Sequence, residues 1–146
     1  MRLVNFDLCT LKRHFDDQSD SRISLETTAF EALLSILESS GFEIVDSDPL
    51  RFENNNNPNQ RRREFASDVL SRAITYVKHS RGIEARAVQL QTVSIGLLDS
   101  LHLASAEHSV CEYFCTTDDV LIKKYLRLNL KMTICNPVNL LEEFTQ

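Results

Sequence analysis

The chain has 146 residues, of which 42% are hydrophobic and 25% are charged, and it carries a formal net charge of −5. This length suits one domain over residues 1–146, and the composition is that of a folded chain, which excludes a disordered one. The acidic balance argues against a broad electrostatic grip on nucleic acid, although it leaves room for a local basic patch.

Targeting signals and cysteine motifs are absent from the sequence. No stretch approaches the roughly 18 apolar residues that a membrane span needs, and the first residues lack the apolar run of a signal peptide. We therefore expect a cytoplasmic protein with no membrane association. The four cysteines form no CxxC pair and lie mostly in apolar runs, which predicts buried free thiols.

The first third of the chain alternates between strand and helix patterns. Residues 2–7 are mostly apolar and predict a strand that ends at Asp7, after which the polar sequence FDDQSDS predicts a turn. Hydrophobic residues at helical spacing predict a helix over residues 24–40, which Gly41 ends. Residues 42–45 then predict a second strand.

The middle of the chain predicts three helices and a loop. Asp48 can cap free amides and Pro49 suits a first helical turn, so we expect a short helix over residues 50–54. The sequence NNNNPN that follows predicts a surface loop. Hydrophobic spacing predicts one helix over residues 61–79 and another over residues 83–94.

The last third predicts three helices and two strands in alternation. The expected ranges are a helix from residue 97 to 107, a strand over 113–116, a helix over 120–128, a strand over 131–135 and a helix over 137–144. Strands that alternate with helices indicate a mainly parallel sheet of four or five strands with helices on both faces. The predicted fold class is thus α/β, a three-layer α/β/α sandwich.

Four acids fall where predicted elements meet the carboxyl edge of this sheet. Asp7 and Asp118 each follow a predicted strand. Glu53 lies on the short helix after the second strand, and Asp99 begins the apolar helix in GLLDSLHLASAE. Ligands of parallel sheets usually bind at this edge, so the four carboxylates are expected to converge. Simpler interpretations exist, with Asp7 as a turn or cap residue, Asp118 as a helix cap and Glu53 as a solvated residue. Asp99 could have a partner or lie at the exposed start of its helix, but its apolar neighbours make it the hardest of the four to dismiss.

Converged carboxylates predict a bound divalent ion, because they repel one another unless a cation lies between them. Oxygen ligands favour Mg²⁺ or Mn²⁺ over zinc, and a water on such an ion can attack a phosphate whose charge the ion screens. His102 lies on the same helix face as Asp99, three residues later. We interpret it as a hydrogen-bonded support of the site and not as a ligand.

Several segments, in this order and spacing, resemble the PIN domain family, and within it the VapC-type toxin ribonucleases of bacterial toxin and antitoxin pairs. The family's first strand and its aspartate are matched by NFDLCTLKRHFDDQ, its glutamate segment by RFENNNNP, its aspartate and histidine-bearing helix by LLDSLHLASAE, its T-x-D strand end by FCTTDDVL, and its closing segment by NPVNLLEEF. The resemblance covers nearly the whole chain. It places the family's acids on Asp7, Glu53, Asp99 and Asp118, with Thr116 as a support, and it leaves Asp119 outside the set.

The resemblance implies a PIN-like fold and a Mg²⁺- or Mn²⁺-dependent endoribonuclease with RNA as its substrate. In this interpretation Asp7, Asp99 and Asp118 hold one or two ions, and Glu53 binds a metal-bound water or orients the nucleophile. Such family members often form homodimers and are inhibited by an antitoxin protein, so both partners are expected here. For RNA contact, the basic candidates are Lys12, Arg13, Arg61, Arg62 and Arg63, although basic runs at a helix start are more often a solvated face.

Two alternatives stay open at the level of the sequence. The family commonly has Ser or Thr directly after its first aspartate, where this chain has Leu8, so a catalytically degenerate PIN domain that binds protein or RNA is one alternative. A phosphate-accepting receiver domain also gathers aspartates at a sheet edge. It needs paired acids near the first strand and a lysine after a late strand, where this chain has Asn136 and Pro137.

Overall fold

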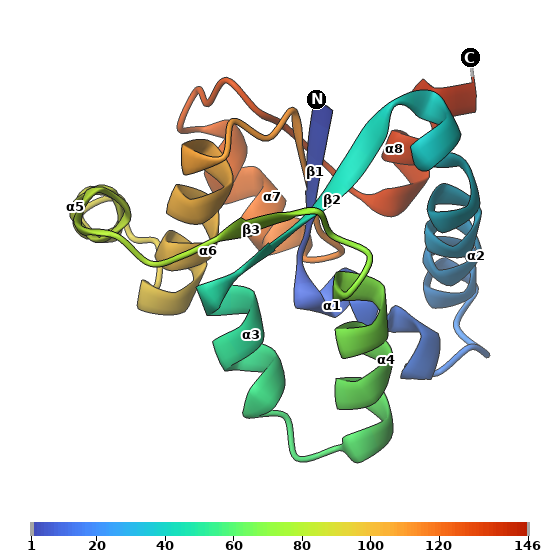
Figure 1. Cartoon of the computed structure of the whole chain (residues 1–146). Coiled ribbons are helices and arrows are strands. Elements are labelled where there is room, and N and C mark those ends of the chain that lie inside the picture. The colour runs from blue at the N-terminus through green and yellow to red at the C-terminus, as the bar shows by residue number, and fades with distance from the viewer. Residues whose placement is uncertain (1, 146) are drawn as a thin grey trace.

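Within residues 2–145, which the computed structural model describes, five parallel strands form one sheet (Figure 1). The strands are β1 (Arg2–Phe6), β2 (Phe42–Ser47), β3 (Thr75–Val77), β4 (Tyr113–Cys115) and β5 (Thr133–Cys135). Their order is β3-β2-β1-β4-β5, so β1 lies at the centre. Val4 of β1 pairs with Ile44 of β2 on one side and with Tyr113 of β4 on the other. This order differs from the 2-1-3-4-5 order of receiver domains, which contradicts that alternative.

Helices cover both faces of the sheet (Figure 1). The helices on one face are α2 (Ser21–Ile36), α4 (Gln60–Leu70) and α8 (Pro137–Thr145), and those on the other are α5 (Arg81–Gln91), α6 (Leu97–His108) and α7 (Asp119–Leu126). The shorter helices are α1 (Leu8–Leu11), α3 (Asp48–Asn55) and the 3₁₀ helices η1 (Arg13–Phe15) and η2 (Glu38–Ser40). The predicted α/β/α sandwich is confirmed.

Side chains of the central strand alternate between two hydrophobic layers. Val4 and Phe6 belong to the layer that α2 covers, where the ring of Phe6 meets the ring of Phe30 edge to face at 5.2 Å. Leu3 belongs to the layer that α6 covers, together with Leu103. These side chains are almost fully buried, so β1 is fixed from both faces and its carboxyl end is held in place.

The segment after α4 corrects one prediction. Helical spacing predicts one helix over residues 61–79, whereas α4 ends at Leu70 and β3 (Thr75–Val77) forms the edge of the sheet next to β2. The sequence ITYV over residues 74–77 consists of β-branched and aromatic residues, which favour a strand. Pairing with β2 therefore outweighs the helical spacing.

The beginning of α3 corrects a second prediction. Ser47 caps this helix, since its hydroxyl accepts a hydrogen bond from the Leu50 N–H at 3.3 Å. Asp48 is the first helical residue, and its carboxylate accepts hydrogen bonds from the Tyr76 hydroxyl at 2.5 Å and from the His79 N–H at 2.6 Å. Asp48 thus ties α3 to the segment around β3.

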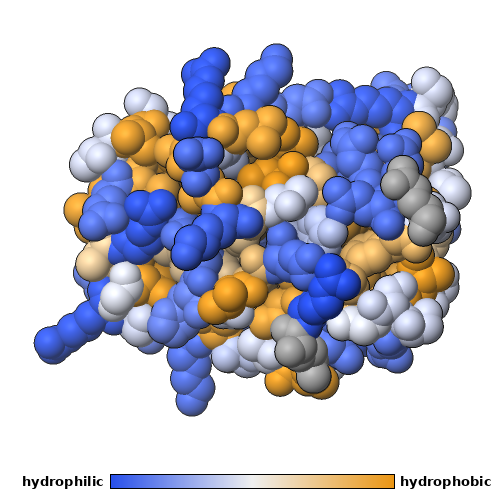
Figure 2. Space-filling view, turned by 90° about the horizontal axis from the view of Figure 1, so that it is seen from above, coloured by the Kyte–Doolittle hydropathy of each residue, from blue (hydrophilic) through white to orange (hydrophobic). Residues whose placement is uncertain are grey.

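The end of the molecule seen from above in Figure 2 lies opposite α3 and α4, which reach the bottom of Figure 1. Hydrophobic patches on this face are divided by hydrophilic side chains (Figure 2). No helix formed by residues 2–145 is both long and apolar enough to cross a membrane.

Candidate metal centre

Asp7 is the first residue after β1 and lies at the carboxyl edge of the sheet. Its Oδ1 accepts a hydrogen bond from the Leu8 N–H at 2.9 Å and so caps α1, a helical turn that the sequence pattern does not predict. Its Oδ2 accepts a hydrogen bond from the Thr116 hydroxyl at 2.9 Å. Both carboxylate oxygens are therefore held, one by the chain that follows β1 and one by the chain that follows β4.

Glu53 and His102 come together from two helices that are 49 residues apart in the sequence. Glu53 lies on α3, His102 lies on α6, and Nε2 of His102 is 2.5 Å from Oε2 of Glu53. The side chain of His102 is 2% exposed and that of Glu53 is 34% exposed. The other ring nitrogen of His102, Nδ1, is buried and has no hydrogen-bond partner within residues 2–145.

Asp7, Glu53 and His102 form the compact part of the site. One possible ligand atom from each residue lies within 4.8 Å of the others. Burial raises the pKa of the Asp7 carboxyl, His102 lowers this pKa, and the charge of Glu53 raises it. A buried carboxylate with a raised pKa gains from a nearby cation, so the donor chemistry of this group fits a divalent ion.

Asp99 and Asp118 lie outside this compact group but inside its electrostatic field. Asp99 is in the first turn of α6, where the helix dipole favours a negative charge. Burial raises the pKa of Asp99, and so do the charges of Asp7, Glu53 and Asp118. Asp118 is exposed and caps α7, because its Oδ1 accepts a hydrogen bond from the Leu121 N–H at 3.1 Å. The structure thus brings all four predicted acids to one end of the sheet, at different depths.

The hydroxyl at this site comes from Thr116, the residue after β4, and not from the residue after Asp7. Leu8 packs into the hydrophobic core, whereas the hydroxyl oxygen of Thr116 donates to Asp7 and accepts from the Asp118 N–H at 3.2 Å. Sequence reasoning missed Cys9, whose Sγ lies 3.2 Å from Thr116 Oγ1 and 3.4 Å from Asp7 Oδ2. Its place two residues after Asp7 is the signal that could have found it. Burial raises the pKa of the Cys9 thiol to about 11, so the thiol is protonated and can donate.

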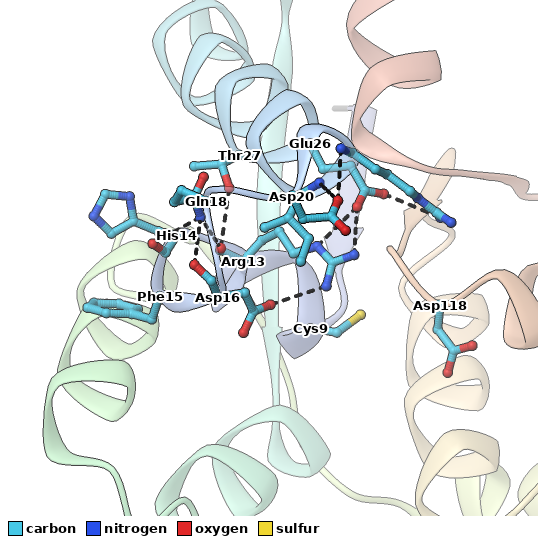
Figure 3. Close-up of polar contacts among 12 residues, drawn as sticks. Cys9, Arg13, His14, Phe15, Asp16, Gln18, Asp20, Glu26, Thr27 and Asp118 are labelled. Atoms are coloured by element: carbon cyan, nitrogen blue, oxygen red, sulfur yellow. Dashed lines mark hydrogen bonds and ion pairs between the residues drawn. The ribbon is translucent and has the colours of Figure 1, made fainter.

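Arg13 and Arg62 belong to a chain of ion pairs, of which Figure 3 shows the part formed by Arg13, Asp16 and Glu26. Nε and Nη2 of Arg13 donate to Oε1 of Glu26 at 3.0 and 2.7 Å, and Nη1 donates to Asp16 at 3.2 Å. Arg62 donates to the other oxygen of Asp16 at 2.9 Å. Because Glu26 is 2% exposed, Arg13 is required to compensate a buried charge. Both arginines are thus engaged within the fold, with Asp118 to the right of this network in Figure 3.

The remaining basic candidates differ in whether their charged groups have a hydrogen-bond or ion-pair partner. Arg63 donates to a backbone carbonyl of its neighbouring loop at 2.8 Å. Arg61 is exposed and its guanidinium forms no hydrogen bond or ion pair within residues 2–145. The ammonium of Lys12 is half-buried and likewise unpaired in this part of the chain. Burial lowers the pKa of Lys12, while the carboxylates of Glu53 and Asp7 raise it, so Lys12 lies in the field of the acids.

Asp119 is paired with an arginine of α2. Its two carboxylate oxygens accept hydrogen bonds from the guanidinium of Arg22 at 2.6 and 2.7 Å. This ion pair joins α7 to α2, and it accounts for Asp119 without a role in the centre.

Comparison with known proteins identifies the fold. No family model matches this chain, and no curated protein matches it. A chain in the crystal structure of VapBC2 from Rickettsia felis bound to a DNA fragment from their promoter matches with a TM-score of 0.61 and 12% identity, over 92% of this chain and 98% of that chain. A chain in the crystal structure of FitAcB from Neisseria gonorrhoeae matches with a TM-score of 0.57 and 15% identity, over 92% and 97% of the two chains. The resemblance to VapC-type PIN domains is confirmed for the fold.

Proposed function

We propose that this chain is a Mg²⁺- or Mn²⁺-dependent endoribonuclease and the toxin of a toxin and antitoxin pair. The observation that carries the proposal is the convergence of the predicted acids at the carboxyl edge of a PIN-like sheet, with Asp7 and Glu53 in one compact group. The fold shared with VapBC2 and FitAcB supports it. The antitoxin partner, the homodimer and the single domain over residues 1–146 are parts of the same proposal.

The acids divide the chemistry between ion binding and water orientation. Asp7, Asp99 and Asp118 would hold the ion, which when bound screens the phosphate charge and lowers the pKa of water. Glu53 has Oε2 engaged with His102, while its Oε1 has no partner within residues 2–145 and its side chain reaches solvent. Oε1 would accept the proton of a water that attacks phosphorus in line, so that a phosphorus–oxygen bond to water forms as the bond to the 3′ oxygen breaks. The 3′ oxygen would leave as an alkoxide whose charge the ion and nearby cations stabilise and which takes a proton from solvent.

Lys12 is the basic residue best placed to contact the scissile phosphate. Its ammonium lies in the field of Glu53 and Asp7 and is not engaged in an ion pair within residues 2–145. Arg61 is the second free cation of the predicted set, whereas Arg13 and Arg62 are held by carboxylates. RNA contact is therefore expected mainly through Lys12, with Arg61, whose guanidinium lies 5.9 Å from the ring centre of Phe15, as a second contact.

The degenerate alternative rests on Leu8, which provides no hydroxyl next to Asp7. The hydrogen bond from Thr116 to Asp7 supports an intact centre instead, because it supplies a hydroxyl from the residue that follows β4. A Mn²⁺ titration followed by thermal unfolding separates the two functions. An intact centre gains about 2.7 kcal/mol of stability at a free ion concentration of one hundred times Kd, whereas a degenerate one gains none.

An RNA cleavage assay tests the activity itself. The substrate is a set of mixed-sequence single-stranded RNA oligonucleotides together with structured cellular RNA, incubated with Mg²⁺ or Mn²⁺ and compared with an EDTA control. Cleavage is expected only with the ion, and Asp99→Asn should reduce it by orders of magnitude while the folded state persists. Cleavage by Asp99→Asn at the rate of the unchanged chain would reject the assignment.

A further inference from the structure

We propose that His102 is a positioning residue whose Nε2–H donates a hydrogen bond to Oε2 of Glu53 and fixes that carboxylate beside Asp7, while neither ring nitrogen binds the ion. The inference rests on the proposed function for the ion. It extends that function, because it states which ring nitrogen of His102 carries the proton and how His102 orients the carboxylate of Glu53.

The unpartnered Nδ1 of His102 decides where the ring proton lies. A neutral imidazole has one N–H donor and one nitrogen with a lone pair. Nδ1 is buried without a hydrogen-bond partner in residues 2–145, so a proton there would be a buried and unpaired donor. A proton on Nε2 instead meets the carboxylate of Glu53 at 2.5 Å, in a charge-assisted hydrogen bond. The structure therefore favours the tautomer with the proton on Nε2.

This tautomer removes His102 from the set of ligands. A nitrogen that carries a proton has no lone pair for an ion, although Nε2 lies 2.5 Å from Oε2 of Glu53 and one ring nitrogen of His102 lies within 4.8 Å of possible ligand atoms on Asp7 and Glu53. Histidines that do bind metals almost always donate their second N–H to an acceptor, which Nδ1 lacks within the described chain. Oxygen atoms alone then face the ion, as Mg²⁺ and Mn²⁺ prefer.

Glu53 needs such a fixed partner. Its side chain is 34% exposed, it lies near the end of α3, and its carboxylate accepts no hydrogen bond from residues 2–145 other than that of His102. The side chain of His102 is 2% exposed and packed inside the molecule. The buried side chain of His102 thus holds the partly exposed side chain of Glu53, and Oε1 of Glu53 stays without a hydrogen-bond partner within residues 2–145.

Nitrogen NMR of the ring tests the tautomer without any ion or RNA. The full chain is labelled with ¹⁵N histidine, and the signals of His102 are assigned by their loss in His102→Gln. At alkaline pH we expect a proton on Nε2 and none on Nδ1, and we expect Nε2 to keep its proton when Mg²⁺ is added. A ring without a proton on Nε2 overturns the proposal, and this result does not depend on nuclease activity.

Paired substitutions test the positioning role. His102→Gln keeps an N–H donor near the place of Nε2 but has no ring nitrogen, whereas His102→Leu has a similar volume and no donor. We expect His102→Leu to lower Mn²⁺ affinity about tenfold, measured by calorimetry, because Glu53 would orient a water on the ion, and the loss of groups that act on a metal from outside its ligand set typically has such effects. His102→Gln should stay close to the unchanged chain, and His102→Leu should have no further effect in a Glu53→Ala background.

The outcomes distinguish this inference from the proposed function. If His102→Gln binds Mn²⁺ as weakly as His102→Leu, or if His102→Leu binds as tightly as the unchanged chain, the positioning role is rejected. Nitrogen coupling in the electron spin-echo spectrum of bound Mn²⁺ that disappears in His102→Gln would identify a ligand and also reject it. If the unchanged chain binds no Mn²⁺, the metal part of the proposed function fails, and the ring NMR still decides the state of His102. The same NMR decides it if His102→Leu does not fold.

Discussion

Asp7 combines two properties that oppose one another, burial and negative charge. The backbone N–H of Leu8 and the hydroxyl of Thr116 each donate to one of its oxygens, which favours the charged form. Burial nevertheless raises the pKa of Asp7 above its ordinary value. The charge of Asp7 therefore lowers the free energy of unfolding of the ion-free protein at neutral pH. Perturbed pKa values of this kind are common at functional sites.

Asp7→Asn is expected to stabilise the ion-free protein at neutral pH. The folded chain binds the Asp7 proton more tightly than the unfolded chain does, so this residue's contribution to the free energy of unfolding falls as pH rises from the unfolded pKa to the raised folded pKa. Removing the charge should raise Tm by about 2–4 °C at pH 7, the shift that roughly 1 kcal/mol gives in a chain of this size. The measurement is thermal unfolding in EDTA from pH 4 to pH 8.

Three further readouts make the Asp7→Asn prediction specific. Its advantage should shrink as the pH falls, because the raised pKa of Asp7 lets the folded carboxyl take up its proton at a higher pH than the unfolded one does. Mn²⁺ should raise Tm of the unchanged chain and not of Asp7→Asn. Asp68→Asn, which changes an exposed acid on α4, serves as the control and should show neither effect. Equal stability of Asp7→Asn and the unchanged chain at every pH would contradict the proposed conflict.

The sequence predicted the acids of the site but not the contacts among their side chains. Strand ends and a helix start place Asp7, Asp99 and Asp118 at one edge, because the carboxyl ends of parallel strands share an edge. The bond between Glu53 and His102 depends on how α3 and α6 lie against each other, which no spacing within either helix encodes. The same holds for the side-chain contacts that join α1 to the end of β4.

At the level of the elements, Asp118 has a structural role in α7 that is separate from its proposed role as a metal ligand. It caps α7 through the Leu121 N–H, and asparagine caps helices about as well as aspartate. We expect Asp118→Asn to keep its stability within a few tenths of a kcal/mol and Asp118→Ala to lose about 1 kcal/mol. Both variants should lose most of the Mn²⁺ response, because both lack the carboxylate.

Urea unfolding with and without Mn²⁺ measures the two duties of Asp118 separately. A full Mn²⁺ response in Asp118→Asn would show that the residue is a cap alone. A stability loss in Asp118→Asn as large as that in Asp118→Ala would show instead that the negative charge, and not the capping bond, stabilises α7.

The order of elements was predictable, and the exception has a physical reason. Strands β1, β2, β4 and β5 and the last helix follow from apolar runs and from Pro137. β3 was missed because Phe65, Val69, Ala73 and Val77 repeat at helical spacing across the end of α4. No glycine or proline marks that end, so only the β-branched run over residues 74–77 could have signalled a strand.

For the whole molecule, net charge and local charge point to a weak electrostatic contact with RNA. The chain carries a net charge of −5, and the acids occupy the very edge at which RNA would bind. Arg13 and Arg62 are neutralised by Glu26 and Asp16. Affinity should therefore depend on few phosphate contacts and on the ion, so that the salt dependence of binding is shallow.

Lys12→Gln should make that salt dependence shallower still. Each phosphate contact contributes about 0.7 to the slope of log K against log salt for a single-stranded nucleic acid, so the slope should fall by about this amount. The measurement is binding of a mixed-sequence single-stranded RNA in the Asp99→Asn background, which prevents cleavage, between low and moderate salt. Arg127→Gln changes an exposed charge at the far end of α7 and should leave the slope unaltered. Arg62→Gln should lower Tm instead, because it leaves Asp16 with one cation fewer. If Lys12→Gln and Arg127→Gln have the same slope as the parent, RNA does not approach the acids past Lys12.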